Sequence, residues 1–208
     1  FIFDEPTDGE LGLFQAGVRP NISQSFLRDI TELLNLPRME FDNTQADVPL
    51  NILSYIYSIL HSPTYRIRYV EFLKIDFPRI PLPGGLPLFQ ELAVLGGELV
   101  ALHLLESPKV NDFSTRFEGQ GDNNIPKKPT WKDGAVWINA SQRFVGVQEA
   151  VWNFHIGGYQ VCQKWLKDRK GRTLSKDDIT HYQKIVIALS ETIRLMAEID
   201  KVIETHGG

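Results

Sequence analysis

The sequence has almost no cysteine and no long apolar run. Among its 208 residues, Cys162 is the single cysteine, which excludes an internal disulfide and a cysteine-rich zinc site and is typical of a reducing cytoplasm. No uninterrupted apolar run approaches the ~18–20 residues that a membrane span requires, and no signal-peptide pattern opens the chain. We therefore expect a cytoplasmic protein that does not contact a membrane. Because the chain begins with Phe1 rather than Met, we also expect it to be a piece of a longer polypeptide.

Signatures of catalysis are missing as well. The sequence contains no phosphate-binding or dinucleotide-binding glycine loop, no His-Glu-x-x-His motif and no Gly-x-Ser-x-Gly nucleophile elbow. The five histidines have no metal-ligand spacing among themselves. Cys162 is predicted to be a buried small hydrophobe, and Asp177 and Asp178 are predicted to stabilise a helix N-terminus. Because no nucleophile, base and orienting group can be assembled, we expect this segment to hold no catalytic site, no metal and no cofactor.

The composition is that of an ordinary globular protein, with 42% hydrophobic and 23% charged residues. This excludes a disordered or collagen-like chain. The length allows one sizeable domain or two small ones, and we expect a single domain over residues 1–208.

Apolar spacing and turn residues predict an α+β fold. The predicted helices span 22–34, 47–61, 62–74, 87–105, 159–168 and 177–205. The adjacent glycines Gly96 and Gly97 predict that another backbone packs very close to the fourth helix. Asp133-Gly134 between strand-forming runs is a hairpin signal, and Trp152, Phe154 and Ile156 alternate as on one strand face. We expect residues 1–108 to be mainly helical, 109–157 to be β-rich and 158–208 to be helical. The helical N-terminal half and the long C-terminal helix would pack around a small antiparallel β-sheet.

The last predicted helix has the clearest pattern. Ser175 is a predicted N-cap, with Asp178 in the capping-box position. A heptad-like stripe follows, formed by Ile179, Tyr182, Val186, Leu189, Ile193 and Met196. Such a stripe favours a partner helix, and the alternative is a core helix within a bundle.

Charge is unevenly distributed along the chain, whose formal net charge is −4. Residues 1–60 carry 3 basic and 9 acidic residues, whereas residues 61–208 carry 19 basic and 17 acidic residues. Residues 164–184 contain 7 basic and 3 acidic residues. A polyanion responds to such a local excess rather than to the net charge. The alternative is a solvated helix end. The predicted phosphate contacts are Lys164, Lys167, Arg169, Lys170, Arg172 and Lys184.

Two blocks of sequence resemble a known family. The first spans 55–66 and 69–81, the latter ending in Asp76-Phe-Pro-Arg-Ile-Pro81. The second comprises Trp152-Asn-Phe-His-Ile-Gly-Gly-Tyr-Gln160, 164–172 and 178–185. Together they resemble the C-terminal region of large adenine-specific DNA methyltransferases. More narrowly, they resemble the specificity domain of single-chain Type I-like (Type ISP) restriction–modification enzymes.

The resemblance implies a target recognition domain that reads a short asymmetric site in double-stranded DNA, so that a neighbouring domain can flip its adenine. The parent polypeptide would be prokaryotic and would carry a nuclease, a motor and an N6-adenine methyltransferase that uses S-adenosylmethionine. The methyltransferase motif Asn/Asp-Pro-Pro-Tyr/Phe is absent from these residues. The resemblance therefore implies that methyl transfer takes place outside this chain.

The residues that read bases should differ between family members that read different sites. We therefore look for them mainly in the less familiar stretch 109–150, and additionally among polar residues of 153–160. Amide and guanidinium groups can form bidentate bonds with bases. The base-reading candidates are Lys127, Lys128, Lys132, Asn139, Gln142, Arg143, Asn153, His155 and Gln160.

A second hypothesis is a docking module that joins the methyltransferase or motor domains and has little DNA affinity of its own. The acidic residues 1–60 and the heptad stripe favour docking, whereas 164–184 favours DNA. A free-standing enzyme is the least favoured interpretation, because no catalytic site can be assembled.

Overall fold

The computed structural model describes residues 3–4, 19–20, 22–35 and 47–207. The chain divides into two compact units, which we call unit 1 (Phe1–Val100 and Met196–Gly208) and unit 2 (Ala101–Leu195). Helices α4 (Leu86–His103) and α7 (Lys176–Thr205) contribute residues to both units. The expectation of a single domain over 1–208 stays a prediction.

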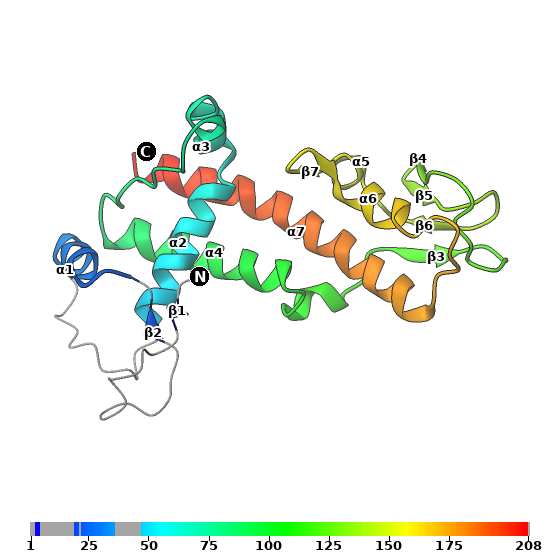
Figure 1. Ribbon diagram of the computed structural model, residues 1–208, viewed down its shortest axis with the longest axis horizontal. Coiled ribbons are helices and arrows are strands. Elements are labelled where there is room, and N and C mark those ends of the chain that lie inside the picture. Colours follow the sequence, from blue (N-terminus) through cyan, green and yellow to red (C-terminus); the bar gives the residue numbers. More distant parts are fainter. Residues whose placement is uncertain (1–2, 5–18, 21, 36–46, 208) are drawn as a thin grey trace. The chain divides into compact units, whose positions relative to one another are not determined.

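Unit 1 is mainly helical (Figure 1). It comprises α1 (Gln24–Leu33), α2 (Asp47–His61), α3 (Pro63–Arg68), η1 (Phe72–Lys74), most of α4 and the end of α7, together with the paired strands β1 (Phe3–Asp4) and β2 (Arg19–Pro20). The predicted helix over 62–74 is shorter than expected: it ends at Arg68 and only the turn η1 follows. The pair β1–β2 was not predicted.

Helices α2 and α4 approach each other closely. A Cβ atom placed on Gly96 would lie 1.8 Å from the Ser54 backbone oxygen. The prediction that a second backbone packs against this glycine is therefore confirmed. The rings of Tyr55 and Phe89 extend the same contact, with centroids 5.5 Å apart.

The short helix α3 is capped from two sides. The Ser62 Oγ accepts a hydrogen bond from the Tyr65 backbone N–H (3.0 Å), and Pro63 occupies the first turn. The Asp200 carboxylate of α7 also accepts hydrogen bonds from the Ser62 hydroxyl and from the Thr64 N–H and hydroxyl (3.0 and 2.7 Å). These contacts attach α3 to the C-terminal part of α7.

Unit 2 contains a four-stranded antiparallel sheet of order β3-β6-β5-β4. Its strands are β3 (Arg116–Glu118), β4 (Thr130–Lys132), β5 (Ala135–Trp137) and β6 (Arg143–Val145). Asp133 and Gly134 both have positive φ angles, of 51° and 76°, as a two-residue hairpin turn requires. The predicted hairpin is confirmed.

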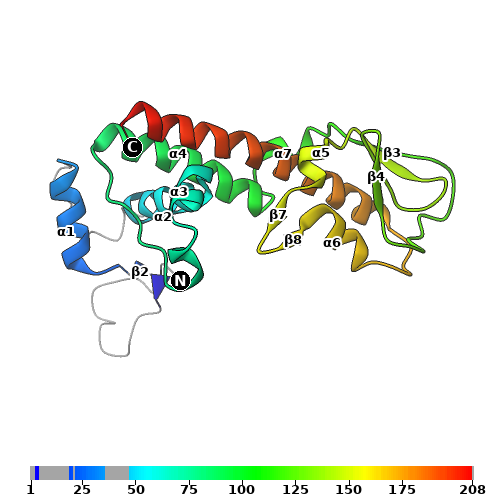
Figure 2. The same ribbon diagram turned by 90° about the horizontal axis from the view of Figure 1, so that it is seen from above.

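Four short elements and the long helix complete unit 2 (Figure 2). They are η2 (Pro108–Asn111), α5 (Glu149–Trp152), the hairpin β7 (His155–Ile156) and β8 (Tyr159–Gln160), and α6 (Val161–Lys167). The prediction that Trp152, Phe154 and Ile156 lie on one strand is wrong, because Trp152 ends the helical turn α5. Val151 and Trp152 are both buried, and consecutive positions of one strand face opposite sides.

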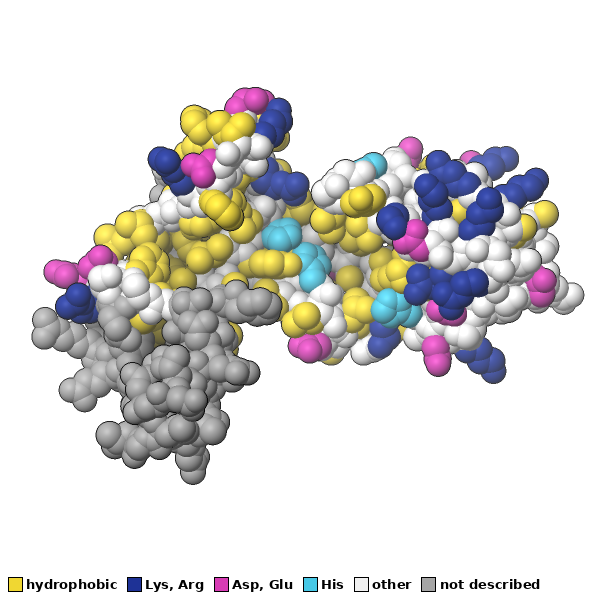
Figure 3. Space-filling view, in the orientation of Figure 1, with side chains coloured by type: hydrophobic (Ala, Val, Ile, Leu, Met, Phe, Trp, Pro, Cys, Tyr) yellow, Lys and Arg dark blue, Asp and Glu magenta, His cyan; other side chains and the backbone are white. Residues whose placement is uncertain are grey.

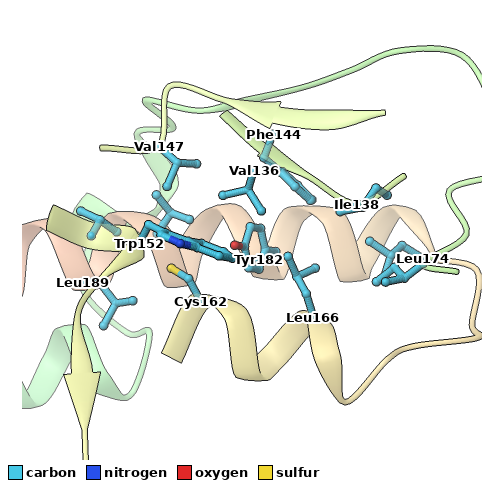
Figure 4. Packing of buried hydrophobic residues seen from close by; sticks show 13 residues of the cluster. Val136, Ile138, Phe144, Val147, Trp152, Cys162, Leu166, Leu174, Tyr182 and Leu189 are labelled. Carbon is cyan, nitrogen blue, oxygen red and sulfur yellow. The ribbon is translucent and has the colours of Figure 1, made fainter. Parts of the chain in front are cut away.

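The core of unit 2 lies between the sheet, α6 and α7. Figure 4 shows Tyr182 between Val136 and Phe144 of the sheet and Leu166 of α6. The rings of Phe144 and Tyr182 have centroids 4.5 Å apart. In unit 2 the heptad stripe of α7 is therefore core, and it is not a free docking surface. The α+β class, with a long C-terminal helix and a small antiparallel sheet, is confirmed.

Among the described residues, one helical stretch, Leu86–Asn111, is long and apolar enough by composition to cross a membrane. The sequence analysis did not anticipate it. Core helices of soluble proteins meet the same criteria, and Leu92 and Leu99 of this stretch are fully buried in the protein.

Candidate nucleic-acid interface

The two units have opposite charge. Unit 2 holds 14 basic and 10 acidic residues, a net formal charge of +4, whereas unit 1 holds 8 basic and 16 acidic residues, a net formal charge of −8. Figure 3 shows Lys and Arg side chains gathered on the visible face of unit 2, over the region of α6 and of β4 and β5.

The segment from α6 to the start of α7 supplies one group of cations. Lys167, Lys170 and Arg172 are exposed, and within the described ranges no hydrogen bond or ion pair engages their charged ends. Lys184 of α7 is half-buried. Lys164 is partly neutralised, because it forms an ion pair with Asp168. Exposed cations without an acidic partner are suited to phosphate contacts.

Backbone hydrogen bonds bring a second group of cations beside the first. The Gly171 N–H donates to the Ile125 carbonyl (2.8 Å), and the Ile125 N–H donates to the Arg172 carbonyl (3.3 Å). Asn124 and Thr173 form an antiparallel bridge between the same segments. The exposed Lys127 and Lys128 follow directly along the chain. Residues predicted as base readers and as phosphate contacts therefore lie on neighbouring segments, which we call the paired-loop surface (121–128 and 167–174).

Gln142 and Asn139, two of the base-reading candidates, connect these loops through hydrogen bonds. Gln142 is 1% exposed. Its Oε1 accepts hydrogen bonds from the Asn123 N–H (2.9 Å) and the Asn139 Nδ2 (3.0 Å), and its Nε2 donates to the Asn123 Oδ1 (2.7 Å). The Asn139 amide also donates to the Asn124 carbonyl (3.0 Å). Both amides are used in hydrogen bonds between the loops, and base reading by these two residues stays a prediction.

Arg169, predicted as a phosphate contact, braces α6 against α7. Its guanidinium carbon lies 3.4 Å from the centroid of the Trp165 ring, its Nη1 donates to the Trp165 carbonyl (3.1 Å), and its Nε lies 3.4 Å from Asp178 Oδ1. These partners leave little of the group for a ligand.

Asp178 completes the predicted capping box. The Asp178 N–H donates to Ser175 Oγ (3.0 Å), and the Ser175 N–H donates to Asp178 Oδ2 (3.0 Å). The hydrogen bond from the Ser175 backbone, assisted by the Ser175 hydroxyl and by Arg169, holds the pKa of Asp178 below its usual value. Asp178 therefore acts as a helix cap, as the sequence predicts.

The remaining candidates lie on two hairpins. Lys132 is exposed beside the β4–β5 turn, and Arg143 on β6 lies between its cross-strand neighbours Glu118 and Trp137. The Arg143 Nη2 is 3.4 Å from Glu118 Oε2, and its guanidinium carbon is 4.6 Å from the Trp137 ring centroid. Arg143 is half-buried and already paired.

The candidates Asn153, His155 and Gln160 belong to the β7–β8 region. Asn153 and His155 are exposed, while the Gln160 Nε2 donates to the Trp152 carbonyl (2.6 Å). Two exposed apolar neighbours there, Ile156 and Tyr159, are not among the base-reading candidates. Their position on either side of Gly157-Gly158 was the available signal.

Two features bear on possible catalytic chemistry among the described residues, the state of the Cys162 thiol and the spacing of potential metal ligands. Burial raises the pKa of the Cys162 thiol to about 12, so the thiol stays protonated at neutral pH and is a poor nucleophile. No three His, Cys, Asp or Glu side chains within the described ranges come together as metal ligands. The prediction that Cys162 is a buried small hydrophobe is confirmed.

A family model matches residues 2–198, and its description is Type ISP C-terminal specificity domain. No curated protein matches the chain.

Solved structures share the fold. The chain bound to DNA in the cryoEM DrdV–DNA complex matches with a TM-score of 0.63 and 20% identity, over 89% of this chain and 20% of that one. LlaBIII, an ATP-dependent Type ISP restriction–modification enzyme bound to DNA, matches with a TM-score of 0.66 and 16% identity. The match covers 95% of this chain and 13% of the LlaBIII chain. A nuclease-deletion mutant of the Type ISP enzyme LlaGI, in complex with a DNA substrate mimic, matches with a TM-score of 0.57 and 21% identity. The match covers 72% of this chain and 13% of the LlaGI chain. The chain thus spans about an eighth to a fifth of these larger chains.

Proposed function

Because this chain belongs to the Type ISP C-terminal specificity domain family, we propose that it recognises a short site in double-stranded DNA through unit 2. The paired-loop surface carries this proposal. Backbone hydrogen bonds hold the segment that carries Lys127 and Lys128 beside the segment that carries Lys170 and Arg172, and phosphates are the natural partners of exposed cations on such paired segments. The solved structures that share the fold are described as DNA complexes, which supports the same conclusion.

We assign two kinds of contact, phosphate contacts to the paired-loop surface with its neighbouring lysines and base contacts to residues outside it. Lys127, Lys128, Lys167, Lys170 and Arg172 would contact phosphates and set the register on the duplex. Base edges would be contacted by three exposed side chains, those of Lys132 beside the β4–β5 turn and of Asn153 and His155 near β7.

We place methyl transfer, S-adenosylmethionine binding and DNA cleavage in other domains of a longer cytoplasmic polypeptide. The larger size of the similar solved chains supports this assignment, as does the absence of an Asn/Asp-Pro-Pro-Tyr/Phe motif from these residues.

The test is fluorescence anisotropy of the 208-residue chain on a random-sequence duplex, between about 50 and about 200 mM salt. We expect binding with a steep negative salt slope. Arg172→Ala should weaken binding to all sequences alike and reduce the slope by about one unit. Lys201→Ala, an exposed lysine of unit 1, is the matched control and should leave the slope unchanged. A wild-type chain that fails to bind at low salt would overturn the proposal.

A second candidate function, docking onto a neighbouring domain, has one specific observation in its favour. Unit 1 exposes a run of large apolar side chains, which we call the apolar segment (67–82). Ile75 and Phe77 are 82% and 89% exposed, and Ile67, Phe72 and Leu82 are also exposed. These five side chains lie within 16 residues of sequence, and large exposed apolar patches mark protein contacts. The hydroxyls of Tyr65 and Tyr55 donate to the carbonyls of Arg79 and Pro81 (2.9 Å each) and hold the end of the segment in place.

The docking function can be tested with the remainder of the parent polypeptide, supplied separately. In sedimentation experiments, we expect the remainder of the polypeptide to form a complex with the wild-type chain. It should form no complex with the Ile75→Ser/Phe77→Ser variant. The exposed Leu50→Ser is the control. Equal binding by all three chains would exclude the apolar segment as the docking surface.

A further inference from the structure

The β7–β8 hairpin presents two apolar side chains at its tip. Gly157 and Gly158 form the two-residue turn, with φ angles of 55° and 83°. Ile156 and Tyr159 are directly paired across the strands, so their side chains share one face of the hairpin. They are 49% and 61% exposed. A Cβ placed on either glycine would meet no atom within 4 Å, so the turn stands in open space.

The base of this hairpin is fixed to the core of unit 2. The Val161 N–H donates to the Phe154 carbonyl (3.3 Å), and the Gln160 side chain donates to the carbonyl of the buried Trp152 (2.6 Å). His155 Nδ1 lies 2.6 Å from the Asn153 carbonyl oxygen. The tip is therefore exposed but held in position, and little conformational entropy is lost when a partner binds it.

The surroundings of the tip are cationic. The Lys164 Nζ lies 5.7 Å from the centroid of the Tyr159 ring. Strand β8 continues directly into α6, which carries Lys164 and the exposed Lys167. A purely apolar protein partner would have to desolvate Lys167, which has no described acidic partner, without compensation, whereas DNA offers phosphates to the cations and base surfaces to the apolar pair.

We propose that the β7–β8 hairpin enters a groove of the duplex and places Ile156 and Tyr159 against the bases, while α6 contacts the adjacent phosphates. This inference rests on the proposed DNA recognition and adds an apolar reading element to it. Apolar side chains contact the thymine methyl group in the major groove or wedge between base steps from the minor groove. When it wedges between base steps, an aromatic ring also stacks on the bases that it separates.

Salt dependence separates this role from phosphate binding, because an apolar contact releases no counterions. Duplexes would be selected from a random pool by the wild-type chain, and affinities measured on the selected duplexes. We expect Tyr159→Ala to lower affinity roughly 5- to 150-fold, the range of a lost base-stacking contact, and Ile156→Ala to lower it by a smaller factor. The salt slope should not change in either variant. Tyr159→Phe, which keeps the ring, should retain most of the affinity.

Phe113→Ala and Leu104→Ala remove other exposed apolar side chains of unit 2 and serve as matched controls with unchanged affinity. Circular dichroism and a thermal melt of each variant would show that the fold persists. If the wild-type chain binds and the hairpin variants bind equally well, the hairpin contact is overturned and the proposed function stands. If the hairpin variants lose slope as well as affinity, the residues act by positioning cations and the base contact is likewise overturned. If the wild-type chain selects no duplex, both proposals fall.

Discussion

Unit 1 and unit 2 differ in what they expose. Unit 1 carries a net formal charge of −8 and the apolar segment, whereas unit 2 carries +4 and the paired-loop surface. The net charge of −4 for the whole chain conceals both properties. Acidic charge repels DNA and cationic charge attracts it, so the two surfaces suit different partners within one chain.

The two units are also held together differently. Unit 1 depends on close packing of backbones, as at Gly96 and Ser54. Unit 2 depends additionally on side-chain amides that join loops distant in sequence, with Gln142 at the centre. Substitutions that attack packing in one unit and hydrogen bonding in the other should sharpen this contrast.

The largest effect is expected for Gly96→Ala in unit 1. The added Cβ would lie 1.8 Å from the Ser54 oxygen, so α2 and α4 would have to separate. We expect a loss of about 3 kcal/mol in the free energy of unfolding, at the upper end of overpacking effects. Gly97→Ala is the control, because its Cβ would lie 3.7 Å from Ser54 Oγ, and it should be neutral or stabilising by up to ~1 kcal/mol. Similar urea unfolding curves for both variants would contradict the close approach.

Gln142→Leu in unit 2 should cost about 2–3 kcal/mol, because the half-buried polar groups of Asn123 and Asn139 would lose their hydrogen bonds to the buried Gln142 amide. It should also weaken DNA binding, since the loop that carries Lys127 and Lys128 would lose its anchor. Thermal unfolding and anisotropy measure the two effects. Gln120→Leu, at an exposed position, is the control. Unchanged stability of the Gln142 variant would show that the amide network is dispensable.

Asp178→Asn tests the cap of α7. Because the folded-state pKa of Asp178 is lowered from 3.8, its carboxylate contributes stability above pH about 4 that is lost as the pH falls through the folded-state pKa. We expect the wild-type chain to exceed the variant by about 1 kcal/mol at pH 7 and the difference to shrink in acid. Unfolding curves at pH 7 and pH 3 provide the measurement, and a difference that grows in acid would contradict the assignment.

The smallest effect on stability is expected for Lys170→Ala, because its ammonium group is exposed and has no described partner. The free energy of unfolding should change by less than ~0.5 kcal/mol, while the salt slope of DNA binding should fall by about one unit. Lys201→Ala in unit 1 should change neither quantity. If Lys170→Ala lowers the free energy of unfolding but leaves the salt slope unchanged, Lys170 stabilises the fold and does not contact DNA.

Local patterns decided the parts of this protein that depend on neighbours in sequence. The helices Asp47–His61 and Lys176–Thr205, the Ser62 and Ser175 caps and the Asp133-Gly134 hairpin were all predictable, because capping, turn geometry and helical spacing act over a few residues. The family was recognisable in the same way, from contiguous strings.

Only the tertiary structure decided which polar side chains remain available for a ligand. Residues 123–125 and 171–174 pair across about 50 positions of sequence. Gln142 and Arg169 resemble any exposed amide or guanidinium in the sequence, but in the fold Gln142 binds Asn123 and Asn139, and Arg169 binds Trp165 and Asp178. Sequence patterns alone predicted the long helices, the β4–β5 hairpin and the excess of cations over residues 164–184. The tertiary structure decided which of those cations and apolar side chains face solvent, because burial depends on contacts between segments that no local pattern encodes.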